Sequence, residues 1–150
     1  DHGFSDVTGY DISAAMIERG HIEYPELALR HYSGAPIPEQ DGSVDAVVCC
    51  ALLTSIPNPG ERRIVVQECY RLLRPGGMLH LIEFTRSENR LYEADGSFRS
   101  GLGIRMVHLY MDQLMDELNL FQTVTVKRIE CLSISGRVEK AIFYQGKTAF

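Results

Sequence analysis

Asp11 is the residue whose type and position best suit the binding of a ligand. It ends a run of near-alternating apolar residues, 6–12, and precedes Ser13, a residue type that begins helices well. This order predicts a strand, then Asp11, then a helix. Ligands of open α/β sheets bind at the carboxyl ends of parallel strands, where a carboxylate can accept two charge-assisted hydrogen bonds from a vicinal diol. The alternative is that Asp11 only caps the helix, which Ser13 already does.

A histidine and three arginines in the second half of the chain are further candidates. His108 would either face a substrate as a base, with Tyr110 close by in sequence, or pack inside the protein. Arg86, Arg90 and Arg99 stand in a polar stretch, where they would either hold an anionic substrate or be solvated. The sequence leaves both pairs of alternatives open.

The four cysteines predict no metal site. They have no CxxC spacing and no matching histidine cluster, which zinc would need. Cys49 and Cys50 end an apolar run and are expected to be small buried thiols. Free thiols favour a reducing, cytoplasmic setting.

The length and composition describe one folded domain. The chain has 150 residues, 45% hydrophobic and 23% charged, which leaves no room for a second large domain. Its net charge of −5 supplies no basic surface for nucleic acid, so a dedicated DNA or RNA reader is not expected, which leaves open an RNA substrate held by a local patch. No apolar run reaches the roughly 18 residues of a membrane span, and no secretory signal is visible.

The central part of the chain predicts a strand, a helix and a second strand. Residues 44–50 are apolar almost throughout, as in a parallel strand buried on both faces at the centre of a sheet. A helix is expected over 61–73, with Arg62 off its apolar stripe, and Pro75-Gly76-Gly77 ends it. The strand 78–84 then completes a right-handed βαβ unit.

The flanking segments predict further elements of an α/β domain. Gly20 is expected to end a short helix with a left-handed cap. After the polar stretch 85–103, apolar residues from Ile104 to Leu118 recur at helical spacing and predict one long helix. The expected strands are 6–12, 27–32, 44–50, 78–84, 123–133 and 138–146, the last antiparallel to its neighbours.

Two segments resemble class I S-adenosylmethionine-dependent methyltransferases of the small-molecule branch that methylates quinones and sterols. Residues 7–20 resemble the second strand of that family, and residues 36–84 its fourth strand, following helix and fifth strand. The spacing from DGSVDAVV through IPNP to LRPGG is the more specific match. The resemblance implies a doubly wound, mostly parallel Rossmann-like sheet with an antiparallel C-terminal strand. It also implies methyl transfer from S-adenosylmethionine to a small-molecule acceptor.

The resemblance also implies the residues that bind the cofactor. Asp11 would bind the ribose hydroxyls, and Leu53 would line the acceptor pocket. Ser33 stands where relatives carry an adenine-binding Asp, and Thr54 and Ser55 where many carry a histidine pair, so no catalytic base is named. The implied cofactor-binding residues are Asp11, Ile12, Ser33, Gly34, Ala35, Cys50, Ala51 and Leu52.

The family's first strand and glycine-rich loop have no counterpart in residues 1–150. Without that central strand, several backbone groups would be unpaired, at about 1–3 kcal/mol for each buried group. We therefore expect one methyltransferase-like domain, truncated at its N-terminus, whose sheet is completed by an upstream segment, in preference to a partner strand from a second copy or a rearranged sheet. The alternative function is a degenerate domain that binds a partner protein without catalysis. A nicotinamide dehydrogenase fits less well, because the IPNP to LRPGG stretch has no evident role there.

The polar stretch 85–103 is expected to be a lid over the acceptor pocket. It leaves the sheet at the edge where ligands bind, and it is long for a connection without periodicity. Gly101 and Gly103 would form its hinge, and Leu91, Tyr92 and Phe98 would make apolar contacts on closure. Together with Leu53 and His108, Tyr92 and Phe98 are the candidate substrate-binding residues.

Overall fold

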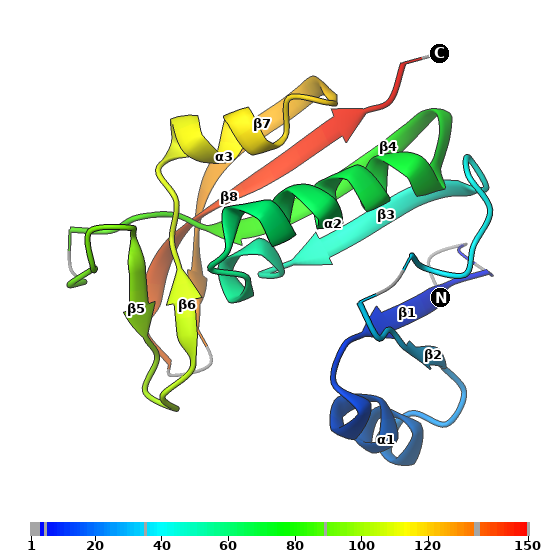
Figure 1. The fold of residues 1–150 in the computed structure, drawn as a ribbon, viewed down its shortest axis with the longest axis horizontal. Coiled ribbons are helices and arrows are strands. Elements are labelled where there is room, and N and C mark those ends of the chain that lie inside the picture. Colours follow the sequence, from blue (N-terminus) through cyan, green and yellow to red (C-terminus); the bar gives the residue numbers. More distant parts are fainter. Residues whose placement is uncertain (1–3, 5, 35, 89, 134–135, 150) are drawn as a thin grey trace. The chain divides into compact units, whose positions relative to one another are not determined.

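The structure, a computed structural model, describes residues 4, 6–34, 36–88, 90–133 and 136–149. The chain divides into two compact units, Asp1–Pro38 and Glu39–Phe150. Figure 1 shows the elements of each unit, and the two units are described separately.

The first unit is a strand, a helix and a parallel strand. β1 (Thr8–Asp11) pairs in parallel with β2 (Ala28–His31), and α1 (Ala14–Glu23) connects them. Ser13 caps α1, because its Oγ accepts a hydrogen bond from the Met16 N–H at 3.3 Å. The predicted order of strand, Asp11, cap and helix is confirmed.

The prediction that Gly20 ends this helix is wrong. α1 continues through Gly20 to Glu23. A Cβ added at Gly20 would lie 2.4 Å from Cδ1 of Leu29 on β2. The glycine therefore serves close packing between the helix and β2, and not a left-handed cap.

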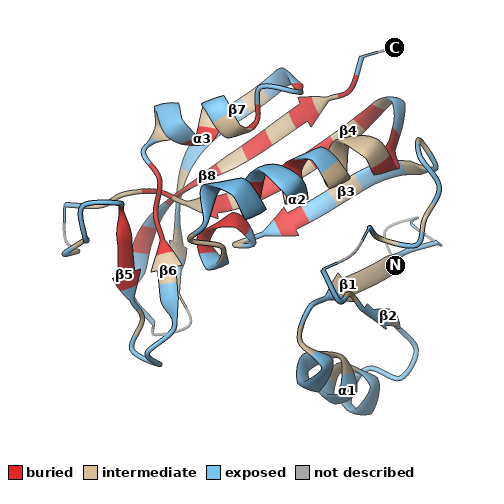
Figure 2. Cartoon of the chain, in the orientation of Figure 1, coloured by how far each residue is buried: buried red, intermediate tan, exposed pale blue. Residues whose placement is uncertain are grey.

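The first unit has almost no interior of its own. None of its described residues is buried, whereas the second unit contains all of the buried ones (Figure 2). Large apolar side chains such as Ile12 and Ile22 are 70% and 77% exposed. Three short elements without a buried side chain cannot offset the conformational entropy that folding costs.

The second unit is built on a four-stranded sheet in the order β3-β4-β8-β7. β3 (Val44–Cys50) is parallel to β4 (Leu73–Phe84), as the predicted βαβ unit requires. β8 (Val138–Lys147) lies antiparallel between β4 and β7 (Gln122–Leu132). The predicted antiparallel C-terminal pair is therefore confirmed.

Two helices pack on one face of this sheet (Figure 1). α2 (Pro59–Leu72) connects β3 with β4, and α3 (Met111–Glu117) precedes β7. A one-turn 3₁₀ helix, η1 (Leu53–Ser55), lies between β3 and α2. Between helices and sheet, the most enclosed side chains are Leu79, Leu81, Leu114, Leu118, Ile142 and Tyr144.

A buried ion pair of Arg62 joins the two helices α2 and α3. Arg62 is 5% exposed, and its Nε donates to both carboxylate oxygens of Glu117 on α3, at 2.8 and 2.9 Å. One of its terminal nitrogens donates to the carbonyl oxygens of Ile56 and Pro57 just before α2. The expectation that this arginine lies off the packed face is wrong, because the ion pair and the two carbonyls satisfy it in the interior.

The strand β3 lies at the edge of the sheet, and not at its centre as predicted. Within the described part of Glu39–Phe150, only β4 pairs with it. Its side chains alternate, so Cys49 is buried in the core while Val48 is 76% exposed and Cys50 is also exposed. The predictions of a strand buried on both faces and of a buried Cys50 are therefore wrong.

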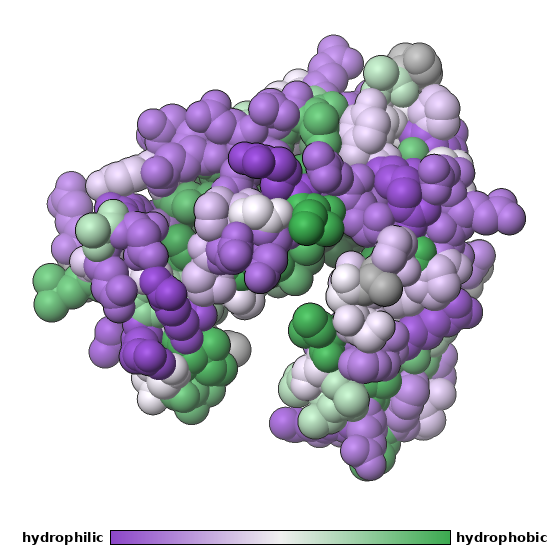
Figure 3. Space-filling model, viewed as in Figure 1, coloured by the Kyte–Doolittle hydropathy of each residue, from purple (hydrophilic) through white to green (hydrophobic). Residues whose placement is uncertain are grey.

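The long helix predicted from Ile104 is also wrong in its first half. β5 (Ser97–Arg99) and β6 (Arg105–Val107) form an antiparallel hairpin, and α3 begins only at Met111. Gly103, with φ +78°, lies in the turn between these strands, so the predicted hinge is a hairpin turn. Figure 3 shows hydrophobic surface at the free end of this hairpin, where Leu102 is 79% exposed.

Candidate functional site

In the first unit, Asp11 lies where the sequence placed it, at the carboxyl end of β1. Its side chain is exposed, and Oδ1 accepts a hydrogen bond from the Ser13 N–H at 2.7 Å. No partner of Oδ2 is found among the described residues. This bond orients the carboxylate and leaves one oxygen for a ligand, so the geometry suits a sugar diol.

The neighbouring candidates of the first unit are exposed as well. Ile12 follows Asp11 with 70% of its surface exposed, which suits an apolar contact with a bound ring. Ser33 is exposed, and Gly34 has φ +83°, in the left-handed region that glycine adopts readily. Ala35 lies outside the described residues.

In the second unit, the chain makes a strained turn directly after β3. Ala51 has φ +51°, and it is the one non-glycine with positive φ that the described residues contain. Its N–H donates to the carbonyl oxygen of Ile82 at 2.8 Å, which holds the turn against β4. Cys50 is exposed and Leu52 is 38% exposed on either side. Backbone strain of this kind concentrates at ligand sites, so this turn suits the role expected of it.

Leu53 does not line an open pocket. It is 3% exposed and belongs to the hydrophobic core of the second unit. Core packing explains its apolar side chain, and contact with an acceptor stays a prediction.

Glu83 is a functional candidate that the sequence analysis missed. It lies on β4, 2% exposed, and its carboxylate accepts hydrogen bonds from the backbone N–H groups of Leu53 and Thr54, at 2.7 and 3.1 Å. These bonds fix η1, the turn of helix that directly follows the strained residue Ala51. Its signal in the sequence is one acidic residue within the apolar run MLHLIEF. Glu83 thus positions the segment expected to meet the cofactor.

Burial raises the pKa of Glu83 to about 7, although the N–H groups of Leu53 and Thr54 favour its charged form. Because the ordinary value is 4.5, the unfolded chain loses this proton first as the pH rises. The contribution of Glu83 to stability should therefore fall between pH 4.5 and about 7 and level off above that range, while the lowered pKa of His108, about 4, acts in the opposite direction below pH 6.5.

We expect the stability of the parent protein relative to Glu83→Gln, which has no proton to release, to fall by about 3 kcal/mol across this range. The contribution of His108 is the same in both proteins and cancels in this difference. The measurement is urea unfolding of the full-length protein at several pH values from 4.5 to 8. Glu130→Gln, on an exposed residue of β7, is the control and should unfold like the parent protein. Equal pH dependence in the parent and in Glu83→Gln would contradict the prediction.

The loop after β4 encloses an aromatic cluster around His108. This histidine is 2% exposed, lies parallel to the Phe84 ring at 5.5 Å and meets the Phe98 ring edge-on at 4.6 Å. Its Nδ1 lies 3.0 Å from the hydroxyl of Tyr92. Phe98 is itself buried. These side chains are therefore already packed together, and no closure of a lid is needed to bring them into contact.

The Tyr92 hydroxyl forms hydrogen bonds with both His108 and the backbone of Ser87. The Tyr92 oxygen accepts a bond from the Ser87 N–H at 3.1 Å, and burial raises the pKa of the Tyr92 hydroxyl, which keeps its proton. Either the Tyr92 hydroxyl or Nδ1–H is the donor in the Tyr92–His108 hydrogen bond, according to the tautomer of the neutral imidazole. Burial and the nearby Arg90 charge lower the pKa of His108 to about 4. The structure favours the packed-histidine alternative over a substrate base.

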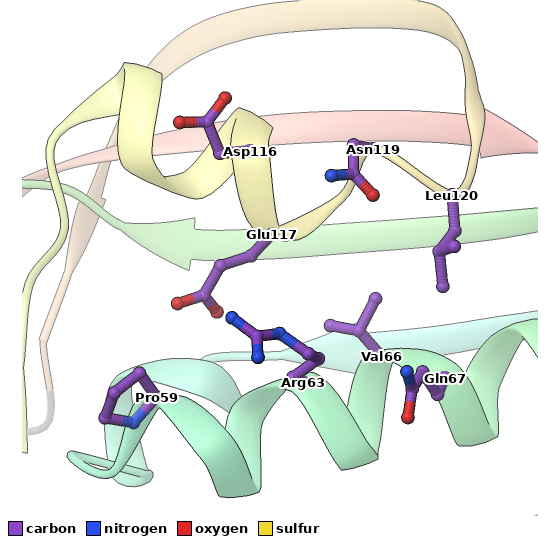
Figure 4. A pocket seen from close by; sticks show the side chains of 8 residues that line it. All are labelled: Pro59, Arg63, Val66, Gln67, Asp116, Glu117, Asn119 and Leu120. Atoms are coloured by element: carbon purple, nitrogen blue, oxygen red, sulfur yellow. The ribbon is translucent and has the colours of Figure 1, made fainter.

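Among the described residues, no group of three or more His, Cys, Asp or Glu side chains is placed to hold a metal ion. No described helix is long and apolar enough to cross a membrane. A groove between α2 and α3 contains none of the predicted site residues (Figure 4). Its lining residues are Pro59, Arg63, Val66, Gln67, Asp116, Glu117, Asn119 and Leu120.

Comparison with known proteins identifies the class. The family described as "Methyltransferase domain" matches residues 1–81, more than half of the chain. The chain therefore belongs to the methyltransferase-domain family.

Curated relatives point to S-adenosylmethionine as the methyl donor of this class. A probable S-adenosylmethionine-dependent methyltransferase of Mycolicibacterium smegmatis is 35% identical over 72 residues, 48% of this chain and 27% of that protein. The human thiol S-methyltransferase TMT1B is 37% identical over 76 residues, 48% of this chain and 28% of that protein. A ubiquinone biosynthesis O-methyltransferase of Dechloromonas aromatica is 28% identical over 92 residues, 55% of this chain and 37% of that protein. The chain thus spans only about a quarter to a third of their lengths.

A solved structure confirms the fold class. A SAM-dependent methyltransferase of Methanosarcina mazei has a TM-score of 0.88 at 22% identity, covering 96% of this chain and 82% of that one. The predicted α/β, Rossmann-like fold of methyltransferase type is therefore confirmed.

Proposed function

We propose that the protein transfers a methyl group from S-adenosylmethionine to a small-molecule acceptor. The observation that carries the proposal is Asp11, an exposed carboxylate oriented by the Ser13 N–H at the carboxyl end of a parallel strand. It belongs to a chain of the methyltransferase-domain family. The alternative of a non-catalytic interaction module has no support among the relatives, which are named as methyltransferases.

The described residues fit such a cofactor in each unit. In the first unit, Asp11 would hold the ribose hydroxyls and Ile12 would contact the adenine side, while Ser33 and Gly34 would lie near the adenine. In the second unit, the exposed residues around Ala51 would offer backbone groups to the methionine end. When bound, S-adenosylmethionine supplies a methyl group on a positively charged sulfur, an already activated donor.

The protein's own contribution is then to position the reactants. Asp11 would bind the cofactor and orient it. Glu83 holds in place the η1 segment, which follows Ala51 in the sequence. His108 is buried and neutral, so it is not an accessible base. We therefore expect proximity and orientation to supply most of the rate enhancement, with an acceptor that is itself nucleophilic.

The segment 85–103 remains the candidate cover of the acceptor site. It contains Tyr92, Phe98 and the strand β5, so any closure would move the β5–β6 hairpin together with these two side chains. The names of the relatives mention a thiol and ubiquinone biosynthesis, which supports small molecules as acceptors.

The four cysteines are free thiols, which supports a reducing, cytoplasmic setting.

Calorimetric titration of the full-length protein with S-adenosylmethionine tests the proposal. We expect binding in the micromolar range, followed by transfer of a labelled methyl group to acceptors from a small-molecule panel. A folded protein that binds no cofactor at millimolar concentration would overturn the proposal.

A further inference from the structure

Arg86 is held in one place at the end of β4. Its N–H donates to the Leu109 carbonyl oxygen at 3.1 Å, and a terminal nitrogen of its guanidinium donates to the Tyr110 hydroxyl at 3.1 Å. The guanidinium carbon lies 5.0 Å from the ring centre of Tyr92 and 4.5 Å from that of Tyr110. A Cβ added at Gly96 would lie 2.6 Å from the second terminal nitrogen of Arg86. The backbone at Gly96 therefore packs directly against the guanidinium.

The charge of Arg86 has no acidic partner among the described residues. Its neighbour Arg90 forms an ion pair with Glu139, and Arg105 forms one with Asp95 at 2.7 Å. The bonds of the Arg86 side chain go only to neutral acceptors, the Tyr110 hydroxyl and the His108 carbonyl oxygen. A half-buried cation without a counter-charge is costly unless a ligand supplies one.

The position of Arg86 suits a ligand. β4 is parallel to β3, so its carboxyl end is at the edge where open α/β sheets bind ligands. The Tyr110 side of the cation remains accessible, because this tyrosine is 53% exposed. A guanidinium matches the planar geometry of a carboxylate, and an exposed aromatic face beside it suits a flat ring.

We propose that Arg86 binds the carboxylate of a small aromatic acid, and that acids of this class are the methyl acceptors. The role of these acids as methyl acceptors rests on the proposed function. Their binding to Arg86 does not, because recognition of the acid needs no cofactor. Of the three arginines singled out in the sequence, Arg86 has this role. Arg90 is neutralised by Glu139, and Arg99 donates to the Gly103 carbonyl oxygen in the hairpin.

The test compares trans-cinnamate with its neutral amide, cinnamamide, on the full-length protein without cofactor. Ligand-observed NMR titration measures both affinities. We expect the acid to bind about tenfold more tightly than the amide, the effect of about 1.4 kcal/mol for one charge-assisted contact. Arg86→Met should remove this preference, and Arg86→Lys should retain part of it, since lysine keeps the charge without the planar fork.

Arg99→Met is the matched control and should keep the full preference for the acid. Circular dichroism verifies that each variant is folded, and S-adenosylmethionine affinity should be the same in Arg86→Met as in the parent. The proposal is overturned if the parent protein shows no preference for the acid, or if Arg86→Met retains it. Failure of cofactor binding in the parent would instead overturn the methyltransferase proposal, and the acid preference would still be measurable.

Discussion

Replacing Arg62 with alanine should lower the free energy of unfolding by about 3–5 kcal/mol, the usual loss when one partner of a buried ion pair is removed. Arg62 is 5% exposed, and its partner Glu117 is largely enclosed as well. The substitution would leave the Glu117 carboxylate and the carbonyl oxygens of Ile56 and Pro57 without their donor. It would also remove the link between α2 and α3.

Urea unfolding of the full-length protein at pH 7 measures this loss. Arg63→Ala is the matched control, because Arg63 is the next residue on α2 and is exposed. Its effect should stay within about 0.5 kcal/mol, as for other surface substitutions. If Arg62→Ala and Arg63→Ala cost the same, the buried ion pair does not stabilise the fold.

Replacing Asp11 with alanine should weaken S-adenosylmethionine binding about 100-fold. Each hydrogen bond to a charged group contributes about 1.5–3 kcal/mol, and a ribose diol would lose up to two such bonds. Ser13 caps α1 through its own Oγ, so the helix should form without Asp11. The effect is thus expected in affinity and not in folding.

Calorimetry with the cofactor measures this affinity, and thermal unfolding without the cofactor checks the fold. Asp6→Ala is the control, since Asp6 is an exposed carboxylate in the same unit but lies before β1. A loss below threefold for Asp11→Ala would show that the carboxylate only shapes the turn at Ser13.

The sequence predicted those elements whose pattern is local. The Ser13 cap, the helix between β3 and β4 and the antiparallel C-terminal strands follow from periodicity and capping residues, and the structure contains them. The prediction of one helix from Ile104 was wrong at its start, because the apolar residues Ile104, Met106 and Val107 also suit a short strand. Pairing of Arg105–Val107 with Ser97–Arg99 decides between the two, and a single sequence does not show this pairing.

The candidate site residues likewise fall into those that the local sequence predicts and those that depend on distant partners. Asp11 was predictable because its position depends on the strand and cap next to it. Glu83 and Arg62 were not, because their partners lie 30 and 55 residues away along the chain. Buried charged groups of this kind look like surface residues in a sequence, and only the fold shows what satisfies them.

The open edge of β3 has a consequence for amide hydrogen exchange. In a parallel strand, alternate N–H groups point to opposite neighbours, so half of those in β3 bond to β4 and half point away from it. If the edge stays free in the full-length protein, exchange along Val44–Cys50 should alternate between slow and fast amides. If a further strand pairs there, from the same protein or a second copy, all of these amides should exchange slowly. The exchange pattern of seven residues thus reports whether the sheet ends at β3.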